Sequence, residues 1–296
     1  MFKRKLDISP LKHGLIPSPK DDRDLLLSSS IPPIVRYPEE YPRPFDLTIY
    51  NQGQSPSCVG WTGAVAKQFL ELKERHYIEP DGEWLYAECK KIDGIPNFPG
   101  TYFRSVLKVL KNVGCKIQGQ DNDPSIYKIS EYRQLDDLSF EGIKKAIAVY
   151  GLVISGWRGS NDGWRSETIR PPYPSESIWG HATALTHYYK NYIGGQNSWG
   201  TVAHRQGLFK APKDYLPYEG WVITVDTPNV AKEPIKTGWC AMNWLQNNIT
   251  TANLNVREQP GTIYKVIATL PQGTQVKLYG SANKPANGFW WTQIIL

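Results

Sequence analysis

One cysteine of this chain occupies a position where a thiol can act as a nucleophile. Cys58 lies at the start of a helix that the apolar spacing predicts over residues 57–77. Unpaired backbone N–H groups and the positive end of the helix dipole lower the pKa of a thiol placed there, which favours the nucleophilic thiolate. The same position also suits an ordinary buried thiol, so the cysteine alone does not distinguish catalysis from packing.

A histidine and an asparagine later in the chain favour catalysis. His181 heads a strand predicted over residues 181–189, and Asn197 follows 16 residues later, after a predicted hairpin. A thiolate needs an imidazolium beside it, and the imidazole needs a partner that fixes its tautomer. We expect Asn197 to hold the ring of His181, and Trp199 to shield that hydrogen bond from water.

The motifs around these residues resemble those of papain-like cysteine peptidases. The resemblance covers about residues 45–225, and it is carried by Asn51-Gln52-Gly53 with Cys58, by Gly180-His181-Ala182 and by Asn197-Ser198-Trp199-Gly200. It implies Cys58 as nucleophile, His181 as general base and acid, and Asn197 as the residue that orients His181. It also implies that Gln52 stabilises the oxyanion together with the backbone N–H of Cys58. The implied reaction is hydrolysis of peptide bonds through an acyl-enzyme, without a cofactor or a metal.

Other segments refine the resemblance. Residues 94–102 are similar to the substrate-lining loop of bacterial members of the family, so we expect the substrate to contact Gly100, Thr101, Gly180 and Trp199. Ser55 and Val59 stand where animal and plant members carry a cysteine and a tryptophan, and the long helical propeptide of those members is missing. Asp21-Asp22-Arg23-Asp24 resembles an early motif of bacterial members. The chain is therefore more similar to the compact prokaryotic or viral branch.

The elements that must position these residues follow an α+β order. Helices are predicted over residues 57–77, 103–113 and 141–150, and short strands follow over 152–154, 181–189, 192–197, 207–210 and 221–225. The resemblance implies a papain-like, two-lobed catalytic domain over residues 46–226. An extended peptide would then lie between a helical half that carries Cys58 and a strand-rich half that carries His181 and Asn197.

The C-terminal segment reads as a separate module. Residues 227–238 have the composition of a linker, and residues 239–296 contain short strand-like runs separated by turn signals, which indicates a small all-β barrel. Three stretches resemble bacterial SH3-like domains, namely residues 254–261, 266–276 and 288–294. The resemblance implies binding to cell-wall peptides, and the alternative is a packing or assembly module.

The first 45 residues are rich in proline and read as an irregular arm. The arm either wraps the surface of the domain or lies across the cleft as an inhibitor. Among the histidines, His187 is expected to pack at a rim, whereas His13, His76 and His204 have no motif around them and are expected at the surface.

Composition restricts the partners. The chain has 296 residues and a net charge of +6 without a clustered basic stripe, so we expect no nucleic-acid partner. It has no run of 18 apolar residues and no apolar stretch after its first basic residues, so neither a membrane span nor a signal peptide is expected. The four cysteines contain no CxxC pair, and we expect reduced thiols and no zinc site.

Three functions remain open at this point. The first is a thiol peptidase acting on protein or peptide substrates, made in the cytoplasm and localised by its SH3-like domain at a bacterial envelope or within a phage particle. The second is a lysin that cuts the stem peptides of peptidoglycan. The third is an inactive structural or binding protein, such as a component of a virion, that retains the fold.

Overall fold

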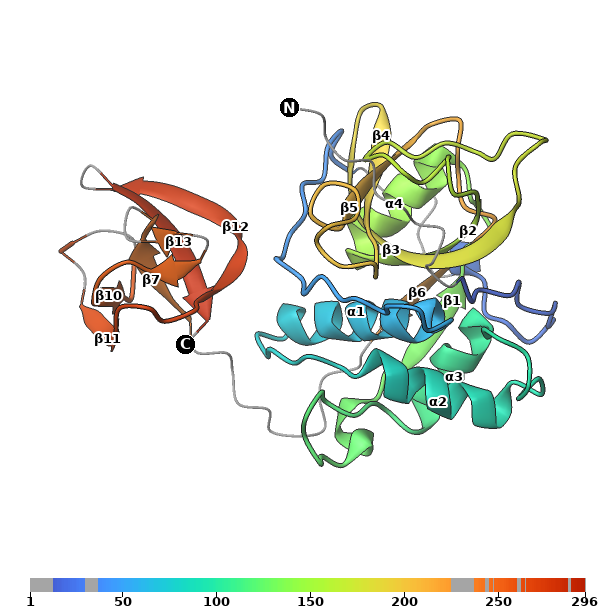
Figure 1. The fold of residues 1–296 in the computed structure, drawn as a ribbon, viewed down its shortest axis with the longest axis horizontal. Coiled ribbons are helices and arrows are strands. Elements are labelled where there is room, and N and C mark those ends of the chain that lie inside the picture. Colours follow the sequence, from blue (N-terminus) through green and yellow to red (C-terminus); the bar gives the residue numbers. More distant parts are fainter. Residues whose placement is uncertain are drawn as a thin grey trace. The chain divides into compact units, whose positions relative to one another are not determined.

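The computed structural model describes residues 13–29, 37–224, 237–242, 245–246, 248–259, 262–263, 265–286 and 289–295. The chain divides into two compact units (Figure 1). The N-terminal unit comprises residues 1–42, 47–71 and 78–231, and the C-terminal unit comprises residues 43–46, 72–77 and 232–296. Most of the predicted linker at 227–238, like the start of the arm at residues 1–12, lies outside the described residues.

Four α-helices belong to the N-terminal part of the chain: α1 (Cys58–Lys73), α2 (Gly82–Ile92), α3 (Phe103–Asn112) and α4 (Phe140–Tyr150), with short 3-10 turns η1 (Leu27–Ser29) and η2 (Pro124–Tyr127). Helix α4 has both of its ends defined by local chemistry. The side chain of Ser139 accepts a hydrogen bond from the N–H of Gly142, and Gly151 ends the helix with a φ of 87°, which favours glycine. Helix α2 was not predicted, although the Asp81 side chain caps it by accepting from the N–H of Trp84.

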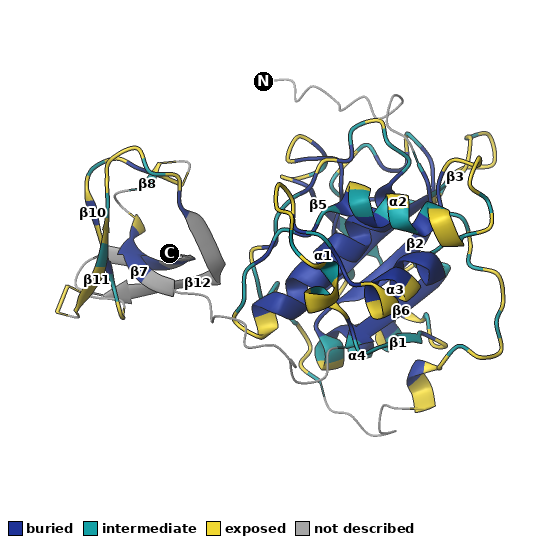
Figure 2. Cartoon of the chain, turned by 90° about the horizontal axis from the view of Figure 1, so that it is seen from below, coloured by how far each residue is buried: buried dark blue, intermediate teal, exposed yellow. Residues whose placement is uncertain are grey.

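Helix α1 is the central helix of the N-terminal unit, and almost all of it is buried (Figure 2). Because α1 is covered on every side, its buried residues are not confined to the single apolar face from which the sequence predicts it. Its buried Lys67 is paired with Glu71 across one helical turn, at 2.6 Å. The helix ends at Lys73 rather than at residue 77, and Arg75 beyond it has a φ of 59°.

A six-stranded antiparallel sheet forms the other part of this unit, in the order β1-β6-β2-β3-β4-β5. The strands are β1 (Glu131–Gln134), β2 (Val153–Gly159), β3 (Trp179–Tyr189), β4 (Tyr192–Gln196), β5 (Leu208–Pro212) and β6 (Glu219–Thr224). Helix α4 packs on β2, β3 and β6. The β3–β4 hairpin pairs Ala184 with Gln196, so the start of β3 and the end of β4 lie at the same end of the hairpin.

The C-terminal unit contains a five-stranded antiparallel sheet in the order β11-β10-β7-β13-β12, and a two-stranded ribbon of β8 and β9. Its strands are β7 (Thr237–Ala241), β8 (Leu245–Gln246), β9 (Ile249–Thr250), β10 (Leu254–Arg257), β11 (Val266–Leu270), β12 (Lys277–Ala286) and β13 (Phe289–Ile295). The unit has its own core, formed by Cys240, Leu254, Val256, Val276 and Ile294. This architecture is the small β region that the sequence predicts.

The arm packs against the N-terminal unit over its described part. Leu15 forms a parallel bridge with Thr101, and Leu26 forms another with Gln134. Leu15 and Leu27 are buried in the core. Residues 13–29 therefore cover both the helical part and the sheet of the unit.

Candidate active site

Cys58 is the first residue of α1, and its side chain is fully buried. The backbone N–H groups of Ala182 and Gly14 lie close enough to its sulfur to favour the thiolate. Burial raises the pKa of the thiol to about 11, and these N–H groups oppose that rise. In this arrangement Cys58 is an uncharged thiol, because removal from water disfavours the thiolate more than the N–H donors favour it.

His181 lies near the start of β3, one residue before the Ala182 N–H that contacts the sulfur. Its Nε2 is 2.8 Å from Oδ1 of Asn197. Its Nδ1 is buried and has no hydrogen-bond partner among the described residues. Burial holds the pKa of the ring well below its usual range. The ring is therefore neutral, and its second nitrogen has no hydrogen bond to satisfy it.

Asn197 follows directly after β4, and several contacts fix its side chain. Its Oδ1 accepts from the backbone N–H of Ser198 at 2.7 Å as well as facing His181. Trp199 stacks on His181, with ring centroids 4.5 Å apart and an angle of 29° between the planes. The indole thus covers the imidazole that is bonded to Asn197.

Gln52 is tied to the same edge of the sheet. The hydroxyl of Ser198 donates to Oε1 of Gln52 at 2.6 Å, and Nε2 of Gln52 donates to the carbonyl of Ser55 at 2.8 Å. The backbone N–H of Gln52 also donates to the carbonyl of Ser198. These bonds hold the amide with its nitrogen directed to the segment that leads into Cys58.

The arm occupies the segments predicted to bind substrate. Thr101 N donates to the carbonyl of Gly14 at 2.8 Å, Ile16 N donates to the carbonyl of Thr101 at 3.0 Å, and Leu15 N donates to the carbonyl of Gly180 at 3.2 Å. The backbone N–H and carbonyl groups of Thr101 and the carbonyl of Gly180, which an extended peptide is expected to bond, are thus already bonded to the arm. The arm therefore wraps the domain and also crosses the site.

Glycine allows this close approach of the arm. A Cβ on Gly14 would lie 1.8 Å from the carbonyl oxygen of Pro56, which is far inside van der Waals contact. On the other side of the arm, a Cβ on Gly180 would lie 2.2 Å from the carbonyl oxygen of Leu15. The arm fits against Cys58 because neither glycine carries a side chain.

His13 is not a surface residue without a role, contrary to the sequence expectation. Its ring stacks on Trp179 at 3.8 Å and meets His181 edge-on at 5.7 Å. Burial lowers the pKa of His13 to about 4, and its Nδ1 has no hydrogen-bond partner within the described part of the chain. No motif around residue 13 indicates this contact, which depends on the path of the arm.

His204 also differs from its expected place at the surface. Its Nε2 is 2.9 Å from Nδ2 of Asn197, and its Nδ1 is 2.8 Å from the carbonyl of Ser166. Burial lowers the pKa of His204 to about 4. The sequence offers no direct signal for this partnership beyond the short distance of seven residues from Asn197.

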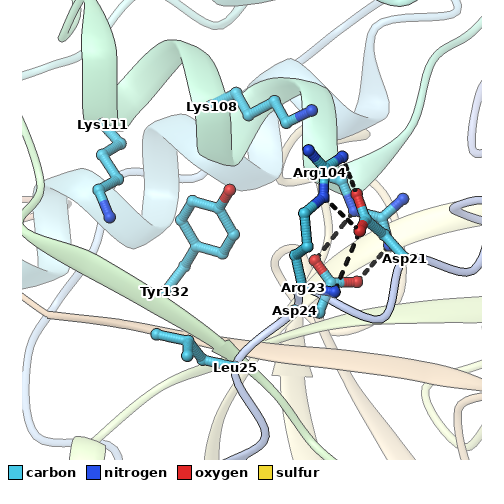
Figure 3. Close-up of a pocket in the computed structure, with 8 residues that line it drawn as sticks. All are labelled: Asp21, Arg23, Asp24, Leu25, Arg104, Lys108, Lys111 and Tyr132. Carbon is cyan, nitrogen blue, oxygen red and sulfur yellow. Dashed lines mark hydrogen bonds and ion pairs between the residues drawn. The ribbon is translucent and has the colours of Figure 1, made fainter.

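A second group of contacts anchors the arm away from Cys58 (Figure 3). Arg104 on α3 forms an ion pair with Asp24 and donates to the carbonyl of Pro19. Beside it lies a pocket of about 270 Å³ with an excess of basic side chains, lined by Asp21, Arg23, Asp24, Leu25, Arg104, Lys108, Lys111 and Tyr132. Both side chains of the Arg104–Asp24 pair are less than one-tenth exposed. Removal of one partner would therefore leave the other charge buried without compensation, which makes the pair a point at which the arm can be weakened.

Metal and membrane features are absent from the described ranges. No three histidine, cysteine or acidic side chains gather there as metal ligands. No described helix has the length and apolar character to cross a bilayer.

Comparison with solved structures identifies the fold of the N-terminal unit. Xylellain, a cysteine protease from Xylella fastidiosa, aligns with 77% of this chain and 100% of its own at 23% identity, with a TM-score of 0.66. The digestive procathepsin L2 proteinase of Tenebrio molitor aligns with 74% of this chain and 80% of its own at 18% identity, with a TM-score of 0.58. A Carica candamarcensis cysteine protease, solved in complex with E-64, aligns with 61% of this chain and 94% of its own at 16% identity, with a TM-score of 0.51. The chain thus has the papain-like cysteine protease fold.

Sequence comparison identifies the C-terminal unit. The family model for the bacterial SH3 domain matches residues 252–295. No curated protein sequence matches the chain. The α+β papain-like domain followed by a small SH3 region, expected from the motifs, is therefore confirmed.

Proposed function

We propose that this chain is a thiol peptidase that its own N-terminal arm holds inactive. The observation that carries the proposal is the 2.8 Å contact between His181 Nε2 and Asn197 Oδ1, combined with the buried, unpartnered Nδ1 of the same ring. Nε2 donates to the amide oxygen, so Nδ1 carries the lone pair that can accept the proton of a thiol. Cys58 is the thiol at this position, because its sulfur lies close to the N–H of Ala182, the residue that follows His181.

The proposed reaction proceeds in two stages. The thiol proton of Cys58 passes to Nδ1 of His181 as sulfur bonds to the carbonyl carbon of the substrate. The oxyanion is held by the backbone N–H of Cys58 and by the amide of Gln52, an arrangement worth about 3 kcal/mol per donor in comparable sites. The tetrahedral adduct collapses, the C–N bond breaks, and His181 gives its proton to the leaving amine. Water, deprotonated by His181, then hydrolyses the thioester and restores the thiol.

The arm covers the proposed nucleophile. Cys58 is fully buried, and the backbone N–H of Gly14 lies close enough to its sulfur to favour the thiolate. Gly14 is held there because its carbonyl accepts from the N–H of Thr101 at 2.8 Å. The docked arm therefore keeps other peptides and water from the thiol.

Turnover of a casein-type protein tests the peptidase, measured in chains whose arm is displaced by Gly14→Val, with and without Cys58→Ala. Cys115→Ala is the matched control, because Cys115 is an equally buried thiol of the same unit and takes no part in the proposed reaction. We expect Cys58→Ala to lose turnover and Cys115→Ala to keep it. A wild type that is inert on all peptides after its arm has been displaced would favour the inactive binding protein.

The bacterial SH3 match supports a second candidate, a lysin for peptidoglycan stem peptides. The C-terminal unit has a pocket of about 270 Å³ with amide, guanidinium and indole groups suited to a peptide, lined by Ala241, Asn253, Leu254, Asn255, Arg257, Thr262 and Trp291. In this candidate the unit localises the chain on a bacterial wall. Zymography in gels that contain cell walls separates it from a general peptidase, which clears casein and leaves the walls intact.

A further inference from the structure

A hydrogen-bond chain continues from the proposed catalytic pair to His204. Asn197 contacts His181 through Oδ1 at 2.8 Å and His204 through Nδ2 at 2.9 Å. The other ring nitrogen of His204, Nδ1, is 2.8 Å from the carbonyl oxygen of Ser166. Four groups are thus linked in series, and a carbonyl at one end determines the direction of every donor.

The direction follows from elementary hydrogen-bond chemistry. A carbonyl oxygen only accepts, so Nδ1 of His204 carries the hydrogen. A neutral imidazole then has a lone pair on Nε2, which accepts from the Nδ2 amide group of Asn197. The amide oxygen must therefore face His181, and Nε2 of His181 must carry a hydrogen. Nδ1 of His181 is left with the lone pair, which is the tautomer that general-base catalysis by this histidine requires.

We propose that His204 is a positioning residue that locks the Asn197 amide and, through it, the tautomer of His181. The proposal rests on the proposed peptidase function for its purpose, and on the described contacts for its geometry. The N–H of Ser198, which donates to Oδ1 of Asn197, acts in the same sense. A reversed amide would place two donors together at Ser198 and two acceptors together at His204.

The backbone around His204 supports a specific role. His204 has a φ of 49°, a left-handed conformation that is unfavourable for a residue with a Cβ. The turn is held by Gly207 N, which donates to the carbonyl of Ala203, and by Asn197 N, which donates to the carbonyl of Gly207. This backbone conformation directs the ring of His204 toward the side chain of Asn197, whose N–H bonds to Gly207 in the same turn.

Neighbouring groups keep His204 neutral and in place. Trp199 stacks on it at 5.8 Å, and Trp164 meets it edge-on at 6.1 Å. Two ionisable groups interact with His204. The charge of Glu167 favours protonation of His204, and a protonated His204 would disfavour protonation of His181. Burial outweighs Glu167, so the lone pair on Nε2 stays available above about pH 4. A protonated His204 would present a second donor to the Asn197 amide and break the chain.

Two substitutions separate positioning from packing. His204→Phe keeps an aromatic ring against Trp199 and removes the acceptor, whereas His204→Gln removes the ring and can place an amide oxygen near the position of Nε2. We expect kcat of His204→Phe to fall ten- to hundredfold, by analogy with the loss when partners that orient metal-bound histidines are removed, with KM nearly unchanged. His204→Gln should remain within about fivefold of wild type. No hydrogen bond, ion pair or ring contact joins His204 to the described part of the arm, so we expect all three full-length proteins to share the same fraction of displaced arm.

The relative kcat of the two variants distinguishes a positioning role from a packing role. If packing alone were required, His204→Phe would be the more active of the two, and that result would overturn the proposal. Equal kcat for wild type and His204→Phe would overturn it as well.

A spectroscopic measurement tests the same proposal without turnover. Long-range ¹H–¹⁵N spectra of the histidine-labelled full chain show which ring nitrogen carries the proton. We expect the proton on Nδ1 of His204 and on Nε2 of His181 in wild type, and a mixture of His181 tautomers in His204→Phe. An unchanged His181 signal in His204→Phe would refute the positioning role even if the chain hydrolyses no peptide. A chain that is inert but shows the expected tautomers would refute the peptidase alone.

Discussion

The carbonyl of Gly14 accepts a hydrogen bond from the N–H of Thr101 at 2.8 Å, and the N–H of the same glycine lies close to the buried sulfur of Cys58. The arm therefore lies against the thiol and is bonded to the loop predicted to hold a substrate. Under the proposed function, each contact lies where the substrate is expected to bind, so arm and substrate would compete for the same surface. The strength of arm docking should consequently control the proposed activity, and several substitutions can alter it without touching the groups that react.

A side chain at residue 14 should open the site. Gly14→Val places a Cβ 1.8 Å from the carbonyl oxygen of Pro56, so the arm can no longer lie in its docked position. We expect at least tenfold faster alkylation of Cys58 by iodoacetamide, measured by mass spectrometry. Lys20→Val, which introduces the same side chain at an exposed position of the arm, should leave the rate unchanged. An unaltered rate in Gly14→Val would mean that the arm does not limit access to the thiol.

The Arg104–Asp24 ion pair should contribute to docking from a distance. Asp24→Asn removes one charge of a pair that is largely buried, and charged hydrogen bonds of this kind contribute about 2 kcal/mol. Peptide turnover should therefore rise, by up to about thirtyfold if docking limits it. Asp22→Asn is the control, because Asp22 makes an exposed contact with Lys20. Equal turnover in the two variants would show that this anchor is dispensable.

Acid should release the arm through His13. The docked ring has a pKa near 4 and a displaced ring has its ordinary value near 6.5, so the displaced state binds the proton more tightly. The docked arm is thus most stable above pH 6.5. The equilibrium constant for docking falls by up to tenfold per pH unit as the pH falls toward 4. Below pH 4, His13 is protonated in both states and adds no further pH dependence. Two other titratable groups of the site, His181 at 5.7 Å from His13 and the thiol of Cys58, are present in both wild type and the His13→Phe variant.

His13→Phe keeps a ring on Trp179 and removes this dependence. We expect the ratio of wild-type to His13→Phe labelling rates, measured with a pyridyl disulfide, to rise between pH 6.5 and 4. A ratio that stays flat over this range would contradict the assignment, because the titration of the other groups cancels in the comparison.

The proposed catalytic residues should fail to different extents. His181→Ala removes the proton acceptor and should lose nearly as much turnover as Cys58→Ala, since members of one catalytic unit are not additive. Asn197→Ala should lose less, because Asn197 orients the ring and transfers no proton. Steady-state kinetics on a short fluorogenic peptide provides the measurement. A folded Asn197→Ala as inactive as His181→Ala would show that the roles are assigned incorrectly.

The C-terminal unit should act in localisation and not in chemistry. A chain that ends near residue 227 lacks the bacterial SH3 match at 252–295 but keeps Cys58, His181 and Asn197. We expect its turnover of a short peptide to remain close to that of the full chain, and its sedimentation with cell walls to be lost, because a tether raises effective concentration without lowering a chemical barrier. Loss of small-peptide turnover in a folded truncated chain would mean that the C-terminal unit helps to build the site.

Local sequence determined the fold class and the proposed catalytic set. The spacing of Gln52 from Cys58 and of His181 from Asn197 lies within single structural units, a loop that enters a helix and a β-hairpin, so short-range patterns are enough to identify them. Helix α4 was predictable for the same reason, because Gly151 ends it by its own backbone preference. Helix α2 was missed although Asp81 caps it, since its apolar residues are few and tertiary packing supplies its stability.

Tertiary structure alone decided what surrounds those residues. His13 and Gly14 reach Cys58 only because bonds to Thr101 and Gly180 draw the arm through the site, and those partners lie more than 80 residues away. His204 meets Asn197 only because a left-handed turn folds it back, and Ser166, which orients it, belongs to another loop. Hydrogen bonds to backbone carbonyls and close approaches at glycine leave almost no trace in residue type. The sequence therefore indicated the groups that we propose to react, and the packing of distant segments decided their protonation and their access to solvent.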